Sequence, residues 1–368
     1  MDHQPARIKF AIIGHQDSWE TVIQFVNAMR FAGDGEELPL HKVQETFTYI
    51  PSRKLFDIEV NSAINGKING VYIETFIAPD ELDIKNLRKN IFKVKKACEV
   101  AAKLGAAVVS LGGFSSIILE TGNQSFENID ETFFTTGNTL TAAFIAKGVE
   151  KACTYWDVSL ENSNLLIIGS TGDIGSACVK YFSGKVNELF LCARQLGPLQ
   201  KQSAELAQKN IRHVSSTSLK ELVPKSDIVI SVASSIIDAN DLDLLPEHAI
   251  VCDAGYPKNL QSNHIKNHER LFYGGMGIVT AGFQFENNAN DILYKFAVPK
   301  VSHGCLLESI VLALENKYCA FSKGKGNITV DAMNEILAMA EKHGIQSAPL
   351  FNSQLIGEIK SKTMYAGE

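Results

Sequence analysis

The sequence predicts an α/β protein with an N-terminal αβ domain, a central doubly wound parallel sheet and a C-terminal helical segment. Two observations support this prediction. Short apolar strands alternate with helical segments along most of the chain, and one strand runs directly into a glycine-rich turn. We place the domains at 1–155, 156–300 and 301–368, and no Pro/Gly/Ser-rich linker separates them.

Composition indicates a globular protein, because 45% of the 368 residues are hydrophobic and 21% are charged. That length suffices for about two domains with sizeable cores. No stretch of 18 apolar residues predicts a membrane span, and the first residues contain no apolar signal region. The seven cysteines form neither a CxxC pair nor a Cys/His cluster, which predicts reduced thiols, no metal site and a cytoplasmic location. The net charge of −6 argues against nucleic-acid binding.

The first domain is expected to begin with a buried strand that ends near Gly14 and a helix that starts at Ser18. Residues 84–104 are expected to form a lysine-rich helix that Gly105 terminates. A polar stretch then leads into a helix from about Thr139. The strands expected in this domain cover 8–15, 71–76 and 106–113.

The central domain alternates short apolar strands with helices, as doubly wound sheets do. After the first of these strands we expect a helix closed by Gly184. From about residue 302 the chain is helical again, and we expect this tail to pack back on the first domain. The predicted central strands cover 164–169, 188–193, 211–216, 227–234 and 249–255.

Three glycines follow the first central strand in the spacing GxxGxxG. Gly169 permits a tight turn, Gly172 lets a pyrophosphate approach the backbone, and Gly175 allows close helix–strand packing. Strand, turn and helix together predict a Rossmann-type dinucleotide site; the alternative is a glycine-rich turn without a ligand. The predicted cofactor-binding residues are Gly169, Ser170, Thr171, Gly172, Asp173, Ile174, Gly175, Arg194, Ala233, Ser234 and Gly255.

The end of the second central strand favours NADPH over NADH. An acidic residue there would bind the ribose 2′-hydroxyl, but the sequence reads "LCARQ", with Arg194 following Ala193. A guanidinium suits a 2′-phosphate. The alternative is a surface arginine without a ligand.

The stretch "SHGCLLESIVLALENK" (302–317) places Cys305 at the start of an apolar helix. If Ser302 is the N-cap, Cys305 is the third helical residue and lies in the positive field of the helix end. That field is expected to lower the thiol pKa from about 8.5 towards 7. Cys305 lies opposite the apolar stripe, on the same side as Glu308 and Ser309. The alternative is a buried, inert structural thiol.

Several strings together resemble the cyanobacterial-type long-chain acyl-[acyl-carrier-protein] reductases. They are "LGGFSSIILE" (111–120), "FTTGNTLTA" (134–142), "GSTGDIGSA" (169–177), "DAGYPKNL" (253–260) and the cysteine of "HGCLLESIVLALE" (303–315). The resemblance implies an NADPH-dependent oxidoreductase of the aldehyde-forming class (EC 1.2.1), and the family's catalytic cysteine maps onto Cys305. Residues 34–56 diverge, Ala254 occupies a glycine position, and His303 departs from the pattern.

The resemblance implies that Cys305 attacks an acyl thioester, forms an acyl-cysteine, and releases a fatty aldehyde after hydride transfer. The substrate would be the acyl carrier protein or CoA thioester of a long-chain fatty acid, and its lipid-soluble product makes loose association with a membrane surface plausible. Donors for the oxyanion are expected in the two polar loops; the alternative for each is an ordinary turn or cap. The predicted substrate-binding residues are Gly112, Gly113, Ser115, Ser116, Thr136 and Asn138.

The stretch 83–100, most of which lies in the helix predicted at 84–104, combines an apolar face with many basic residues. It would attract an acidic carrier protein, although such charge runs are often simply solvated. The residues expected to face the core are Ile84, Leu87, Ile91, Val94 and Cys98. The basic residues expected on the surface are Lys85, Arg88, Lys89, Lys93, Lys95 and Lys96.

Two other functions fit parts of the sequence. A shikimate-type NADP-dependent dehydrogenase also joins an αβ domain to a Rossmann domain, but Leu140 stands where that class needs an aspartate. A non-catalytic NADP-sensing or scaffold protein would retain the fold without chemistry.

Overall fold

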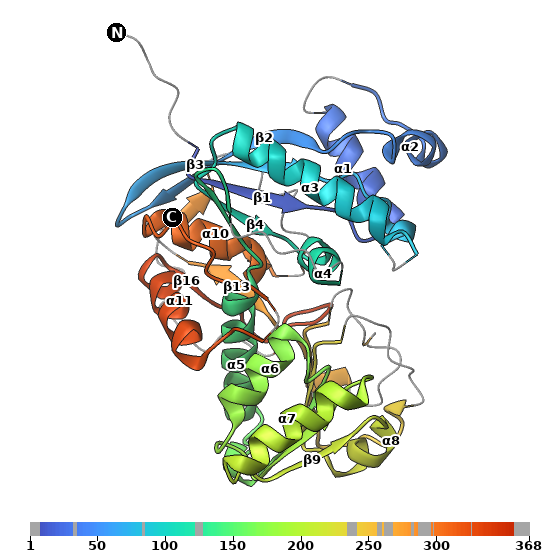
Figure 1. The fold of residues 1–368 in the computed structure, drawn as a ribbon, viewed down its shortest axis with the longest axis vertical. Helices are drawn as coiled ribbons and strands as arrows, with labels where there is room; N and C mark the ends of the chain where they lie inside the picture. The colour runs from blue at the N-terminus through green and yellow to red at the C-terminus, as the bar shows by residue number, and fades with distance from the viewer. Residues whose placement is uncertain are drawn as a thin grey trace. The chain divides into compact units, whose positions relative to one another are not determined.

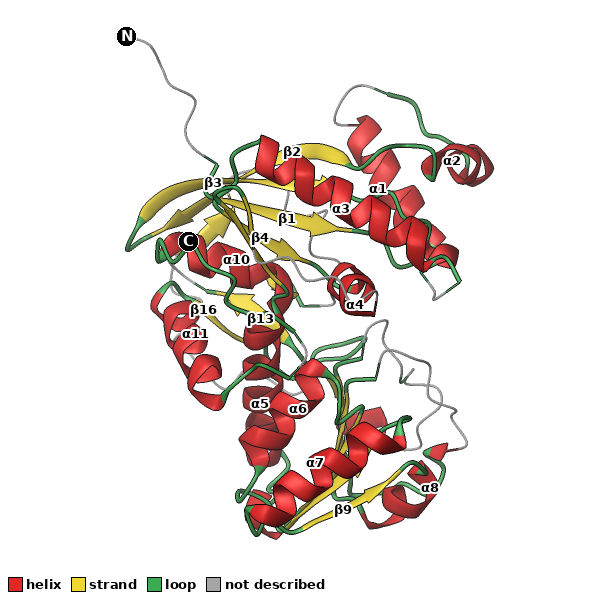
Figure 2. Ribbon diagram, viewed as in Figure 1, coloured by secondary structure: helices red, strands yellow, loops and turns green. Residues whose placement is uncertain are grey.

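The computed structural model describes residues 8–31, 35–82, 85–121, 128–233, 241–255, 260, 268–280, 283–285, 296, 298–324 and 326–356. The chain forms two compact units, and each unit is built from three separate stretches of the sequence. Figures 1 and 2 show the helices and strands of both units. Unit 1 contains 1–137, 281–295 and 305–323, and unit 2 contains 138–280, 296–304 and 324–368. Among the described residues, no helix is long and apolar enough to cross a bilayer.

Unit 1 is built on a seven-stranded sheet in the order β14-β2-β3-β1-β4-β6-β5. The strands β3, β1, β4 and β6 are parallel, whereas β2, β14 and β5 pair antiparallel with their neighbours. The strands are β1 (Phe10–Gly14), β2 (Arg53–Ser62), β3 (Gly66–Glu74), β4 (Val108–Leu111), β5 (Asn128–Ile129), β6 (Thr132–Thr135) and β14 (Phe283–Phe285). The helices are α1 (Trp19–Phe31), α2 (Leu40–Phe47), α3 (Leu87–Lys103), α4 (Phe114–Thr121) and α10 (Gly304–Leu314).

Helices α3 and α10 lie on opposite faces of this sheet. Alternate side chains of a strand point to opposite faces. Val109 and Leu111 of β4 pack in one core with residues of α3. Ser110, between them, instead accepts a hydrogen bond from Ser309 Oγ of α10 at 2.9 Å. The sheet is therefore buried on both sides, which explains the continuous apolar runs in β1 and β4.

Unit 2 contains a six-stranded parallel sheet in the order β12-β11-β10-β7-β8-β9, which confirms the predicted doubly wound class. Its strands are β7 (Asn164–Ile168), β8 (Glu188–Cys192), β9 (His213–Ser216), β10 (Ile228–Ser231), β11 (Ile250–Asp253) and β12 (Leu271–Tyr273). The helices are α5 (Asn138–Tyr155), α6 (Asp173–Phe182), α7 (Leu196–Gln208), α8 (Leu219–Leu222) and α11 (Val330–Lys342). A small antiparallel sheet, β15-β13-β16, joins β13 (Met276–Val279), β15 (Val301–His303) and β16 (Ile345–Ser347).

The ends of several helices follow the sequence closely. Ser18 Oγ accepts the Thr21 N–H at 3.1 Å and caps α1, and Gly105 and Gly184 adopt positive φ values of 73° and 77° just after α3 and α6. The C-terminal tail contains strands as well as helices. Its first helix, α10, belongs almost wholly to unit 1, whereas α11 belongs to unit 2. The boundary expected at residue 155 is the end of α5, a helix that the contacts assign to unit 2.

Helix α3 corrects one expectation about its basic residues. Val94 and Cys98 are fully buried as predicted, and Leu87 and Ile91 pack partly buried against the same core; Ile84 lies outside the described residues. Lys93, however, is only 9% exposed. Its ammonium donates to the carbonyls of residues 48, 50 and 76. An ammonium has three protons to donate, so these three acceptors make its burial tolerable.

Replacing Lys93 with methionine should lower the free energy of unfolding by about 2–4 kcal/mol, because buried carbonyls lose a charged donor. One of these carbonyls belongs to Phe76, whose φ of 55° is unfavourable for a bulky residue. Denaturant titration would measure the change. Lys96→Met is the matched control, since Lys96 pairs with Glu99 at the surface and its loss should change stability by less than about 0.5 kcal/mol. Equal effects of the two variants would contradict a structural role for Lys93.

Candidate active site

Several candidate functional residues of unit 1 lie at the carboxyl edge of its sheet. His15 follows β1, Gly112 and Gly113 follow β4, Thr136 follows β6, and Glu74 ends β3. These four strands are parallel, so their carboxyl ends meet at one edge. Ligands of α/β proteins bind at such an edge, and the sequence had pointed only to the loops after β4 and β6.

Cys305 is the second residue of α10, not the third, and Ser302 is not its N-cap. Ser302 lies in β15 and is buried, and the helix begins at Gly304. Cys305 itself is partly exposed. Glu308 and Ser309, which share the side of α10 opposite the apolar stripe, are nevertheless fully buried. Sequence periodicity reveals the most apolar stripe of a helix, and cannot show that its other side is buried too.

Two glycines let the loops after β4 and β6 approach the start of α10. Gly137 has a φ of 74°, and a side chain there would collide with the backbone of Cys305. A Cβ on Gly112 would lie 2.8 Å from Leu306 Cδ2 and 2.9 Å from the carbonyl oxygen of Ile13. Larger residues would therefore displace the helix that carries the thiol. The structure thus brings Gly112, Gly113 and Cys305 together within unit 1.

The electrostatics of Cys305 differ from the sequence-based expectation. Burial, followed by the negative charge of Glu308, raises the pKa of the thiol to about 11, although hydrogen bonds from the backbone of Gly113, Leu306 and Cys305 itself act in the opposite direction. The first turn of α10 therefore provides stabilising donors but does not outweigh desolvation. In the absence of substrate the protein keeps Cys305 as a thiol at neutral pH.

Burial also raises the pKa values of Cys153 and Cys192 to about 11 and that of Cys178 to about 12. What distinguishes Cys305 from these buried thiols is its partial exposure and its position at a helix start, where the backbone of Gly113 and Leu306 lowers its pKa.

Glu308, one turn after Cys305, is a functional candidate that sequence analysis missed. Its carboxylate is fully buried and accepts hydrogen bonds from Thr135 Oγ1 and, at 2.7 Å, from Ser322 Oγ. Ser322 N–H donates in turn to Thr135 Oγ1 at 2.9 Å. The cluster joins α10 to β6 and to the segment after the helix. Its members are 173 and 14 residues from Glu308 in the sequence, so no local pattern reveals it.

Replacing Glu308 with glutamine should lower the pKa of Cys305, because it removes the charge that opposes the thiolate but keeps an acceptor for the two hydroxyls. Alkylation by iodoacetamide at pH 8 should accelerate by up to about tenfold, the equivalent of one pKa unit. The measurement uses a Cys319→Ser background, because Cys319 is also partly exposed. Glu315→Gln, just beyond the far end of α10, is the control and should leave the rate unchanged.

The predicted substrate residues have different surroundings. Ser115 Oγ is fully buried and has no hydrogen-bond partner, whereas Ser116 Oγ donates to the Gly113 carbonyl at 3.2 Å. Thr136 is tied through its N–H to the Ser322 carbonyl at 3.0 Å. Asn138 belongs to unit 2, where its Nδ2 donates to Asp173 Oδ2 at 2.8 Å.

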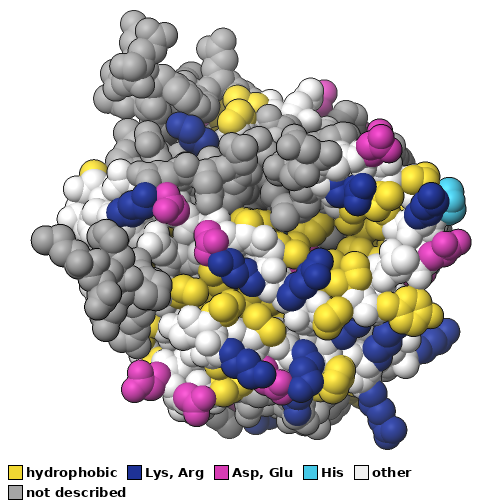
Figure 3. All heavy atoms as spheres, turned by 90° about the horizontal axis from the view of Figure 1, so that it is seen from above, with side chains coloured by type: hydrophobic (Ala, Val, Ile, Leu, Met, Phe, Trp, Pro, Cys, Tyr) yellow, Lys and Arg dark blue, Asp and Glu magenta, His cyan; other side chains and the backbone are white. Residues whose placement is uncertain are grey.

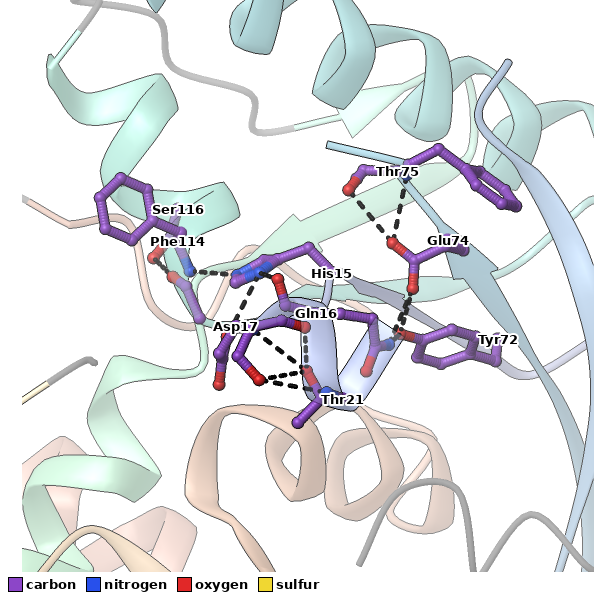
Figure 4. Close-up of polar contacts among 12 residues, drawn as sticks. His15, Gln16, Asp17, Thr21, Tyr72, Glu74, Thr75, Phe114 and Ser116 are labelled. Carbon is purple, nitrogen blue, oxygen red and sulfur yellow. Dashed lines mark hydrogen bonds and ion pairs between the residues drawn. The ribbon is translucent and has the colours of Figure 1, made fainter. Parts of the chain in front are cut away.

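A buried polar network occupies the same edge beside β1 and β3 (Figure 4). Glu74 is fully buried, and its Oε2 accepts from Gln16 Nε2 at 3.0 Å and from Tyr72 Oη at 2.9 Å. Burial raises the pKa of Glu74, opposed by these bonds and by His15. Gly14 has no side chain where a Cβ would collide with Tyr72, which permits the close packing of this network. Gln16, Tyr72 and Glu74 were not singled out from the sequence.

The glycine-rich loop of unit 2 has the geometry of a phosphate-binding turn. Gly169 has a φ of 87° and donates its N–H to the Cys192 carbonyl at 2.8 Å. Gly172 precedes α6, and a Cβ on Gly175 would collide with the Gly169 carbonyl. The backbone therefore requires glycine at 169 and 175, whereas a Cβ on Gly172 would lie 3.3 Å from the Gly169 carbonyl oxygen and would narrow the turn. Thr171 lies on the same turn, which leads into the N-terminus of α6, and Ile174 is the second residue of that helix.

Two buried hydroxyls at this loop have no partner among the described residues: Ser170 Oγ in the turn and Ser231 Oγ at the end of β10. Asp173, by contrast, is held by the Gly326 N–H at 2.8 Å in addition to Asn138. Burial is the main influence on Asp173 and raises its pKa. Unpaired buried hydroxyls beside a glycine turn fit a polar ligand such as a dinucleotide.

The remaining predicted cofactor residues lie at the carboxyl ends of the neighbouring strands. Arg194 is exposed and lies two residues after β8, the strand whose last carbonyl holds the glycine loop. Ala233 approaches Gly169 from the chain after β10. Gly255 donates its N–H to Asp253 Oδ1 at 3.0 Å, and Ser234 lies outside the described residues. Within the described part of the chain, no group of three His, Cys, Asp or Glu side chains could hold a metal ion.

Comparison with known proteins identifies relatives along nearly the whole chain. The long-chain acyl-[acyl-carrier-protein] reductase of Synechococcus elongatus is 30% identical over 356 residues, which cover 93% of this chain and 99% of that protein. The aminotransferase PigE of a Serratia species is 26% identical over 299 residues, 79% of this chain but 34% of PigE. No protein-family model matches the chain.

The solved structures that resemble this chain are less similar to it in sequence than these relatives. Dipicolinate synthase A chain from Bacillus subtilis is 12% identical, with 73% of this chain and 89% of that chain covered and a TM-score of 0.35. The nucleotide-binding domain of glutamyl-tRNA reductase from Thermoplasma volcanium is 17% identical, with 36% and 84% covered and a TM-score of 0.26.

Proposed function

The chain belongs to the long-chain acyl-[acyl-carrier-protein] reductase family, and from this membership we propose that it reduces a long-chain acyl thioester to a fatty aldehyde with NADPH. The observation that carries the proposal is the position of Cys305 as the second residue of α10, where the backbone of Gly113 and of the first helical turn favours the thiolate form. The test is direct: purified protein, acyl-acyl carrier protein and NADPH should yield an aldehyde that gas chromatography detects. If no acyl thioester yields an aldehyde, the proposal fails.

In the proposed reaction, the Cys305 thiol loses its proton as its sulfur bonds to the thioester carbonyl carbon. The carbon–sulfur bond to phosphopantetheine breaks, and the departing thiolate takes up a proton, so that an acyl-cysteine remains. Bound NADPH supplies the hydride that reduces this acyl carbon. The carbon–Sγ bond then breaks, which releases the aldehyde and returns Cys305 as a thiolate that is reprotonated. Backbone N–H groups at Gly113 and the first turn of α10 stabilise the negative charge on Cys305 in each step.

The high pKa of Cys305 fits a covalent step that requires substrate. A thiol with a pKa of about 11 is protected from alkylation and oxidation while the site is empty of substrate. Deprotonation is then coupled to attack, and the acyl-cysteine carries no charge that burial would disfavour.

Residues of unit 2 would hold the dinucleotide. The N–H groups of the Gly169–Gly175 turn and the N-terminus of α6 would bind its pyrophosphate. The hydroxyls of Ser170 and Ser231 lack partners that a ligand would supply. Arg194, exposed beside the same turn, would bind the 2′-phosphate that distinguishes NADPH from NADH.

The exposed side of α3 is the proposed docking surface for an acidic carrier protein. Arg88, Phe92 and Lys96 follow one another at four-residue spacing, and Phe92 is 61% exposed with the Lys96 ammonium 5.5 Å from its ring centre. An exposed aromatic among cations suits an acidic partner. In Figure 3, Lys and Arg side chains lie among apolar ones on the face shown, and several Asp and Glu side chains lie beside them. Lys93 plays no part in this surface, because its ammonium is buried.

Reversing the charges of Arg88 and Lys96 to glutamate should raise KM for acyl-acyl carrier protein, most strongly at low salt, where electrostatic steering is least screened. KM for acyl-CoA should change less. The control is reversal of Lys54 and Lys67, which lie on β2 and β3 rather than α3. If acyl-CoA and acyl-acyl carrier protein respond equally, α3 is not the docking surface.

A further inference from the structure

His15 is a buried histidine at the carboxyl end of β1 that the proposed chemistry does not use. Its side chain is 1% exposed, and its ring packs edge to face on Phe114 with the ring centres 6.4 Å apart. Figure 4 shows the imidazole between the chain after β1 and the start of α4. A buried polar ring in this position needs hydrogen-bond partners.

The two ring nitrogens of His15 have different roles. Nε2 lies 2.8 Å from the backbone nitrogen of Phe114 and accepts its N–H. An acceptor nitrogen carries no proton, so in the neutral ring the proton is on Nδ1. Nδ1 lies 3.5 Å from the carbonyl oxygen of Gln16 and 3.5 Å from Asp17 Oδ1. The acidic groups that interact with the ring include Asp17 and, through an electrostatic interaction, Glu74.

The N–H that His15 accepts is adjacent in the chain to that of Gly113, whose backbone favours the thiolate form of Cys305 and so lowers its pKa. Phe114 N–H donates to His15 Nε2 at 2.8 Å, and the preceding Gly112 lies against the first turn of α10 at Leu306. Two successive N–H groups can diverge in this way because Gly113 adopts a φ of 53°, a conformation that glycine accepts without strain. The loop is fixed on its other side by Gly112, whose N–H donates to the Ile13 carbonyl at 2.8 Å. The orientation of the Gly113 N–H thus depends on a bond at each side of it.

From this geometry we propose that His15 is a positioning residue. By accepting the Phe114 N–H at Nε2, it holds the 112–116 loop so that the Gly113 N–H remains directed at the sulfur of Cys305. His15 acts through the loop and does not exchange a proton with substrate, because its Nε2 is already engaged. The kinetic consequence rests on the proposed function, whereas the effect on the thiol does not.

The test compares two amides at position 15. His15→Gln places an acceptor oxygen near the position of Nε2, whereas His15→Asn is too short and places it near that of Nδ1. We would measure the pH profile of Cys305 alkylation by iodoacetamide in a Cys319→Ser background, and kcat and KM for acyl-thioester reduction. His248, exposed in unit 2, supplies the matched controls His248→Gln and His248→Asn.

His15→Asn should shift the alkylation profile to higher pH, because the thiolate loses its Gly113 donor. Its kcat should fall on the order of tenfold to a hundredfold, as small displacements of reacting groups cause, with KM nearly unchanged. His15→Gln should restore both towards the wild type. An unchanged profile in His15→Asn, or equal impairment in the two variants, would overturn the proposal.

If circular dichroism shows that His15→Asn does not fold, the test rests on His15→Gln. The proposal then requires that His15→Gln folds and has the wild-type pH profile of Cys305 alkylation, and any other profile would overturn it. If no acyl thioester is reduced by the wild type, the proposed function fails, and the alkylation profiles still test the role of His15.

Discussion

Replacing Cys305 with serine should abolish aldehyde formation while NADPH still binds. A serine hydroxyl is far less acidic than a thiol, and an oxygen ester would be a poor substitute for the acyl-cysteine. The loss in kcat should be on the order of a thousandfold or more, as for other nucleophile replacements. Aldehyde formation by gas chromatography and NADPH binding by fluorescence titration would be measured on the same preparation.

The controls for this variant are Cys153→Ser and Cys192→Ser, which change buried thiols of unit 2 with similarly raised pKa values. They should retain activity in proportion to the folded fraction. Near-normal turnover in Cys305→Ser would contradict a covalent mechanism, and loss of NADPH binding would show that the substitution had disturbed more than the nucleophile.

Replacing Arg194 with alanine should weaken NADPH binding roughly tenfold to a hundredfold and change NADH binding little. A charge-assisted hydrogen bond to phosphate contributes about 1.5–3 kcal/mol, which corresponds to that range. The side chain is exposed and lies directly after β8, so its removal should not disturb the core. Dissociation constants for both dinucleotides would be measured by fluorescence titration.

Arg212→Ala is the matched control, because Arg212 is also an exposed arginine of unit 2 and hydrogen-bonds Asn187 at 3.0 Å. It should leave the preference between the two dinucleotides unchanged. If Arg194→Ala also leaves that preference unchanged, another group recognises the 2′-phosphate.

The features that sequence analysis predicted well depend on local patterns. The strands β7, β8, β10 and β11 are buried on both sides, so they appear as short continuous apolar runs. The glycine turn after β7 requires glycines at fixed positions, which the spacing shows directly. The strand β2 was missed, because its charged residues alternate with partly buried ones near one side of the sheet.

The features that were missed or wrong depend on residues far apart in the chain. Lys93 looked like a surface lysine, and only carbonyls from residues 48, 50 and 76 make its burial possible. Glu308 was placed on the side of its helix opposite the apolar stripe, and only the distant Thr135 and Ser322 provide the hydrogen bonds that its burial requires. The thiol of Cys305 was expected to be acidic from its place on a helix, whereas desolvation by the surrounding fold dominates its pKa. Such effects cannot be read from a residue's neighbours in sequence.

The most direct test of the central claim is the mass of the protein after incubation with a long-chain acyl-acyl carrier protein in the absence of NADPH. The mechanism predicts a single acyl adduct that maps to the peptide containing Cys305, disappears in Cys305→Ala, and is released as aldehyde when NADPH is added. No adduct with any acyl thioester, or an adduct that persists in Cys305→Ala, would contradict it.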